Sequence, residues 1–85
     1  MQPEYRLQLG IDQSFTVTTV FDKWKASKGQ DTDTAQYEVR NPSGELVTQY
    51  EIRDSTSMYP PFGRSVSYTE YSATGQETGS GSLKF

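Results

Sequence analysis

This 85-residue chain contains no His and no Cys, so the groups that we consider first for acid–base chemistry are its carboxylates. Zinc fingers, iron–sulfur clusters and Ser–His or Cys–His nucleophilic pairs are therefore excluded. Two carboxylate pairs could act as general acid and base, Asp31 with Asp33 and Glu38 with Glu51. The first pair has no apolar neighbour to raise a carboxyl pKa, and the second lies on strands with charged outer faces. We expect solvated carboxylates, no catalytic residues and no enzyme.

The Asp31-Thr32-Asp33 segment has the spacing of the first residues of a calcium-binding loop. Such a loop requires Gly at its sixth position and Glu at its twelfth, and this chain has Gln36 and Pro42 there. We therefore expect no metal and no cofactor.

The local basic group consists of Lys23, Lys25 and Lys28 around Trp24, a combination that can stack on single-stranded nucleic acid. The chain has eight basic and eleven acidic residues, with a formal net charge of −3. Phosphate contacts need clustered cations on a basic surface, so nucleic acid is not an expected partner. We expect a solvated strand edge beside a core or partly buried Trp24.

The most unusual segment is the loop from Met58 to Arg64, which contains Met, Tyr, Phe, Arg and two consecutive Pro residues. These residue types are enriched at the centres of protein interfaces, and proline reduces the entropy lost on docking. The predicted partner-binding residues are Met58, Tyr59, Pro60, Phe62 and Arg64. The alternative is structural: the Tyr59 and Phe62 rings fold back and cap an open end of the sheet.

Six Tyr residues could instead form an aromatic surface for a glycan or a small apolar ligand inside a small β-barrel. Tyr68 and Tyr71 have opposite parity on the strand that carries them, so they should point to opposite faces. A barrel of this size is usually filled by its own side chains. Both points weaken the ligand alternative.

Alternating apolar and polar residues predict most of the elements that must position these groups. The first predicted strand covers 5–11, where Tyr5, Leu7, Leu9 and Ile11 alternate with polar residues or Gly. A second strand over 15–21 is expected to pair with it as a hairpin. Residues 20–28 either continue this strand or form one short helix, and residues 28–34 are expected to be a solvated loop.

A type I turn at Asn41-Pro42-Ser43-Gly44 predicts a hairpin between strands over 34–41 and 45–54. A bulged three-residue loop would place Val39 opposite Val47, whereas a four-residue loop would place Tyr37 opposite Tyr50. A further strand starts at Val66. The Gly- and Ser-rich end, residues 73–85, is either a short last strand or a flexible tail.

These elements predict a single all-β domain over residues 1–85. We expect an antiparallel meander of five to six strands, as a barrel or a two-layer sandwich, with one short helix near 20–28 as the alternative. The expected core residues are Tyr5, Leu7, Leu9, Ile11, Phe15, Val17, Phe21, Trp24, Val39, Ile52, Val66 and Tyr68.

The predicted function is that of a non-enzymatic binding module acting through protein–protein contact, such as a small inhibitor or an accessory subunit of a larger assembly. The partner is another protein, and a homo-oligomer formed by edge-strand pairing is the second expectation. The first four residues, Met1-Gln2-Pro3-Glu4, have neither the basic region nor the apolar core of a signal peptide. We therefore expect a soluble, acidic domain without membrane contact, in the cytoplasm.

Overall fold

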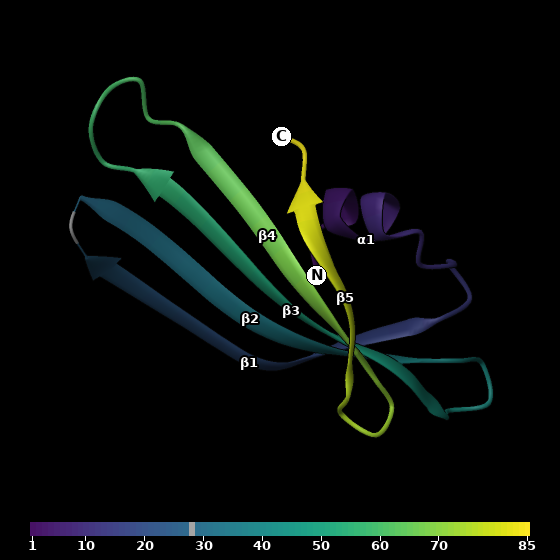
Figure 1. Ribbon diagram of the computed structural model, residues 1–85. Helices are drawn as coiled ribbons and strands as arrows, with labels where there is room; N and C mark the ends of the chain where they lie inside the picture. Colours follow the sequence, from purple (N-terminus) through teal and green to yellow (C-terminus); the bar gives the residue numbers. More distant parts are fainter. Residues whose placement is uncertain (28) are drawn as a thin grey trace.

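The computed structural model describes residues 1–27 and 29–85 as one five-stranded antiparallel sheet with a short helix packed on it (Figure 1). The strands follow each other in the sheet in chain order, β1 to β5. The elements are α1 (Pro3–Leu9), β1 (Thr16–Ser27), β2 (Gln30–Arg40), β3 (Leu46–Ser57), β4 (Arg64–Ser72) and β5 (Glu77–Leu83). The predicted all-β meander of five strands is confirmed. The sheet is not closed into a barrel, which agrees with the two-layer option.

The first predicted strand is wrong, because Pro3–Leu9 forms helix α1. Pro3 occupies the first turn, where its missing N–H costs nothing, and Gly10 adopts the left-handed conformation with φ 70°. The Gly10 N–H donates to the Leu7 carbonyl at 3.2 Å and ends the helix. Strict alternation places Tyr5 and Leu9 four residues apart, so the same pattern also gives one apolar helical face. The hairpin expected between 5–11 and 15–21 therefore does not form.

The helix expected as an alternative near 20–28 is also wrong, because strand β1 runs from Thr16 to Ser27 and pairs with β2. A bulge at Val20 shifts the register between the two strands. The loop predicted for 28–34 is wrong from Gln30 onward, where β2 begins, and Lys28 lies outside the described residues. This polar segment forms a strand because its backbone pairs with β1 on one side and β3 on the other.

The hairpin at 41–44 is confirmed, and its register is the one that places Tyr37 opposite Tyr50. The Asn41 side chain accepts hydrogen bonds from the backbone N–H groups of Ser43 and Glu45, both at 3.0 Å. The later strand is confirmed as β4, and the Gly- and Ser-rich end contributes β5.

The core lies between α1 and the sheet face that it covers, on the side to which alternate residues of each strand point. Tyr5, Val39, Ile52 and Val66 are buried as predicted. Other predicted core residues are partly buried against this cluster: Leu9, Ile11, Phe15, Val17 and Tyr68. Five buried residues were not predicted from the sequence: Ala35, Tyr37, Tyr50, Thr69 and Leu83.

Three predicted core residues are exposed instead: Leu7, Phe21 and Trp24. Leu7 is on the helix, two positions from the buried Tyr5, and therefore faces away from the sheet. Phe21 and Trp24 are on β1, which is an edge strand whose residues from Thr18 to Ala26 are all exposed.

Candidate functional site

The predicted contact loop lies between β3 and β4, at the same end of the sheet as the β1–β2 connection (Figure 1). Its three large apolar side chains are exposed, by 42% at Met58, 67% at Tyr59 and 57% at Phe62. The loop is nevertheless held by backbone hydrogen bonds. The Met58 N–H donates to the Gly29 carbonyl at 2.7 Å, and the Phe62 N–H donates to the Tyr59 carbonyl at 2.8 Å.

The alternative for this loop was that the Tyr59 and Phe62 rings cap an open end of the sheet. The structure supports it only in part, through a contact of Tyr59. The Tyr59 ring lies against Gly29 in the β1–β2 connection, where an added Cβ atom would clash with the ring. This contact ties two neighbouring hairpin ends together but leaves most of the ring in solvent. Phe62 adopts φ 58°, a left-handed conformation that is rare for a bulky residue. The loop therefore presents its apolar side chains on an ordered backbone.

Arg64, the last predicted contact residue, interacts with other residues of the same chain. Its Nη2 and Nε donate to the Asp54 carboxylate at 2.5 and 2.9 Å, and the guanidinium lies 4.1 Å from the centre of the Phe85 ring. The Tyr5 hydroxyl also donates to Asp54 and accepts from Arg64 Nη2 at 3.4 Å. The pKa of Asp54 is lowered, chiefly by the hydrogen bond from Arg64. This cluster joins α1 and the C-terminal segment to β3 and β4, so Arg64 acts here as a structural residue.

The two predicted acid–base pairs have different surroundings in the sheet. Glu38 and Glu51 lie on the sheet face opposite the helix, each beside an Arg two residues further along its own strand. Glu38 Oε1 is 3.4 Å from Arg40 Nη2, and Glu51 Oε1 is 2.5 Å from Arg53 Nη1. Asp31 and Asp33 lie on β2, with Asp33 at the rim of a cavity.

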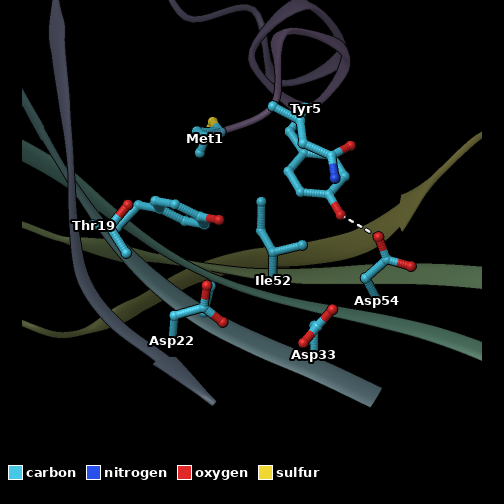
Figure 2. A pocket seen from close by; sticks show the side chains of 10 residues that line it. Met1, Tyr5, Thr19, Asp22, Asp33, Ile52 and Asp54 are labelled. Atoms are coloured by element: carbon cyan, nitrogen blue, oxygen red, sulfur yellow. Dashed lines mark hydrogen bonds between the residues drawn. The ribbon is translucent and has the colours of Figure 1, made fainter. Parts of the chain in front are cut away.

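A cavity of about 270 Å³ lies between the start of α1 and the sheet, and sequence analysis did not predict it. Figure 2 shows three carboxylates pointing toward it from three neighbouring strands: Asp22 from β1, Asp33 from β2 and Asp54 from β3. Met1 and Tyr5 bound it on the helix side, and Ile52 lies at its floor (Figure 2). The signal available in the sequence was weak, because the three Asp residues converge only through the strand register.

The register explains why these carboxylates gather. Asp33 of β2 is directly opposite Asp54 of β3. Asp22 of β1 is opposite Ala35, which follows Asp33 as the next residue on the same face of β2. Like charges directly opposite each other on neighbouring strands are destabilising. Arg64 compensates Asp54. Within residues 1–27 and 29–85, neither Asp22 nor Asp33 forms an ion pair.

Tyr37 also lines this cavity, with its ring in the core. Burial, followed by the charges of the three carboxylates, raises the pKa of Tyr37 above its usual value. In contrast to the Tyr5 hydroxyl, the Tyr37 hydroxyl forms no hydrogen bond with any residue of the described part of the chain. Among those residues, no group of three or more Asp and Glu side chains is arranged to hold a metal ion.

The aromatic and basic residues of β1 do not share one face. Lys23 and Lys25 are opposite Thr34 and Thr32 and point away from the helix, whereas Trp24 is opposite Asp33 and has the other parity. The group expected around Trp24 is therefore split between two faces, with Lys28 outside the described residues. Tyr68 and Tyr71 likewise have opposite parity on β4, and Tyr50 packs edge-on against Tyr68 with ring centroids 6.3 Å apart.

No protein-family model matches this chain, and no curated protein or solved structure resembles it at a significant level. In the described part of the chain, no helix has the length and apolar character needed to cross a membrane.

Proposed function

We propose that this protein is a non-enzymatic binding module that contacts another protein through the loop 58–64. The observation that supports this function is the exposure of Met58, Tyr59 and Phe62 together on a backbone-bonded loop. A loop whose backbone is already hydrogen-bonded before binding loses less entropy when a partner buries its apolar side chains. An inhibitor or an accessory subunit of a larger assembly is the kind of protein that works in this way.

The left-handed conformation of Phe62 adds to the argument. A bulky residue in this conformation costs roughly 1–3 kcal/mol, which the surrounding structure must offset. Gly or Asn at the same position would remove that strain. A contact of the exposed Phe62 ring with another protein would offset this cost and would explain why Phe occupies the position.

Edge-strand pairing is the second mode of protein contact that we propose. Strands β1 and β5 form the two edges of the sheet, and β1 is twelve residues long. Two copies could extend the sheet by pairing their β1 strands. Sedimentation of the purified protein over a concentration series tests this mode, because self-pairing predicts a dimer whose fraction rises with concentration.

The test of the loop compares three baits in an affinity pull-down from lysate, read by mass spectrometry. The wild type is compared with a Tyr59→Ala/Phe62→Asn double variant, in which Asn suits the left-handed backbone. A Leu7→Ala variant is the matched control, since Leu7 is an exposed apolar residue on α1. Circular dichroism first establishes that each bait is folded.

The proposal expects a partner that wild type and Leu7→Ala retain and the loop variant loses. A partner retained by all three baits would move the binding surface away from the loop. No enriched partner on any folded bait would contradict the proposed function.

A further inference from the structure

Strand β1 forms a free edge of the sheet, and its charged side chains are sorted between the two faces (Figure 1). Lys23 and Lys25 point away from α1, whereas Asp22 is opposite Ala35 and points to the face that α1 covers. Neither lysine forms an ion pair with any of residues 1–27 and 29–85. The outer face of this edge, the face away from α1, therefore presents two adjacent positive charges to a strand that joins it.

The neighbouring strands carry the same separation of charge across this end of the sheet. In the row of Lys23, Arg53 of β3 lies on the outer face, where it is paired with Glu51. On the α1 face, Asp33 of β2 joins Asp22. A complementary added strand therefore places acidic side chains on the outer face, and complementary charge of this kind selects partners.

A second copy of β1 does not supply that charge. In an antiparallel pair, side chains that are directly opposite each other lie on the same face of the sheet. The one acidic residue of β1 is Asp22, which is on the α1 face, so no register of two antiparallel β1 strands places an acid opposite Lys23 or Lys25. Registers that align lysine with lysine are destabilised by like charges. A second copy is therefore the weaker occupant of this edge.

Apolar surface on both sides of the edge adds to the selection. On the outer face, a hollow of about 360 Å³ is lined by Phe21, Lys23, Lys25, Thr32 and Thr34. The Phe21 side chain is 43% exposed there, and Trp24 is 61% exposed on the other face. Apolar side chains opposite these two rings would remove part of their surface from water, as cross-strand pairs do within a sheet.

We infer that β1 binds an extended segment of another protein as an added antiparallel strand, with acidic side chains opposite Lys23 and Lys25 and an apolar side chain opposite Trp24. Backbone hydrogen bonds along the edge provide the affinity, and the side chains provide the selectivity. The inference rests on the proposed edge-strand mode, for which it names the preferred partner, and it does not depend on the loop 58–64.

The experiment is an NMR titration of the ¹⁵N-labelled full chain with two peptides of identical composition and net charge. The in-phase peptide, acetyl-Thr-Val-Glu-Val-Glu-Arg-Val-Thr-amide, has its acids on alternate residues, so both can face the lysines. The out-of-phase peptide, acetyl-Thr-Val-Glu-Glu-Val-Arg-Val-Thr-amide, has them on consecutive residues, so only one can. We expect saturable shifts at the amides of β1, with a Kd of roughly millimolar order for the in-phase peptide and about threefold weaker binding of the other.

Two charge variants separate the edge from general charge attraction. Lys23→Gln/Lys25→Gln should weaken binding of the in-phase peptide by roughly fivefold, and it should bind the two peptides about equally. Arg40→Gln/Lys84→Gln removes the same charge, but Arg40 pairs with the opposite end of β1 and Lys84 follows β5. This control should change the Kd by less than about twofold. The spectra of the free variants establish that each is folded.

The outcomes decide whether the edge selects an acidic strand. Tighter binding of the in-phase peptide at β1, lost in the lysine variant and kept in the control variant, supports the inference. It is overturned if neither peptide shifts the β1 amides, if both bind the wild type equally, or if both charge variants weaken binding to the same extent. A wild-type dimer in sedimentation that the in-phase peptide does not dissociate would also overturn it, because a second copy would then occupy the edge. None of these failures affects the pull-down test of the loop, whose variant changes only Tyr59 and Phe62.

Discussion

The hydrogen bond between the Tyr5 hydroxyl and Asp54 holds helix α1 on the sheet, and a single-atom change tests it. Tyr5 is 4% exposed and is the one buried residue of α1. Tyr5→Phe removes the hydroxyl and keeps the ring, including its edge-on contact with Phe85 at 5.5 Å between centroids. The change therefore leaves no cavity, and its effect reports the polar interactions alone.

The expected loss of stability follows from the partners. A hydrogen bond to a charged group contributes about 1.5–3 kcal/mol. The Asp54 side chain is 14% exposed and keeps its Arg64 partner, so the lower half of that range applies. We expect Tyr5→Phe to lower the free energy of unfolding by about 2 kcal/mol. That is a large fraction of the roughly 4–13 kcal/mol typical of an 85-residue domain.

Urea unfolding followed by circular dichroism measures this effect. With a slope of about 1 kcal/mol per M for a small domain, the midpoint should fall by roughly 2 M. Tyr37→Phe is the matched control, because Tyr37 is also buried but its hydroxyl has no partner in the described residues. It should change the free energy by less than about 0.5 kcal/mol. Equal midpoints for the two variants would refute the role assigned to the Tyr5–Asp54 hydrogen bond.

Two further predictions concern acid stability and the β1–β2 connection. Because the pKa of Asp54 is lowered in the folded state, its contribution is present above its unfolded pKa of about 3.9 and is lost as pH falls through the folded pKa. Thermal unfolding between about pH 5 and 2 should therefore show a steeper decline for wild type than for Asp54→Asn, and parallel curves would contradict this. Gly29→Ala and Gly44→Ala both place a Cβ at positive φ, but only the Cβ at Gly29 meets the Tyr59 ring. Gly29→Ala should cost about 1 kcal/mol more in urea unfolding, and equal costs would show that the ring moves aside freely.

The loop 58–64 and the cavity beneath α1 depend on different kinds of information in the sequence. The loop 58–64 was predictable because its composition departs from that of the flanking strands, and its position between two strands follows from local signals. The role of Arg64 was not predictable, because Asp54, Tyr5 and Phe85 meet it only after the sheet has folded. An arginine in an interface-like segment can serve a partner or the protein itself, and only its neighbours decide which.

The sequence by itself determined the turns, most of the strands and one hairpin, because these depend on residues close together in the chain. Asn41, Pro42 and Gly44 specify a turn through their own backbone preferences. The N-terminal segment shows the limit of this reasoning: its alternation suits a strand, yet Pro3 and Gly10 delimit a helix that packs Tyr5 on the sheet.

Only the tertiary structure decided which face each strand buries and which side chains converge. A shift of one residue in register would move Asp22, Asp33 and Tyr37 to the opposite face of the sheet, and no local pattern sets that register. Pairing of the strands with their neighbours, together with the packing of α1 on one face, places these residues around a single cavity. Contacts between residues distant in sequence depend on the whole sheet, and so this cavity exists only in the folded protein.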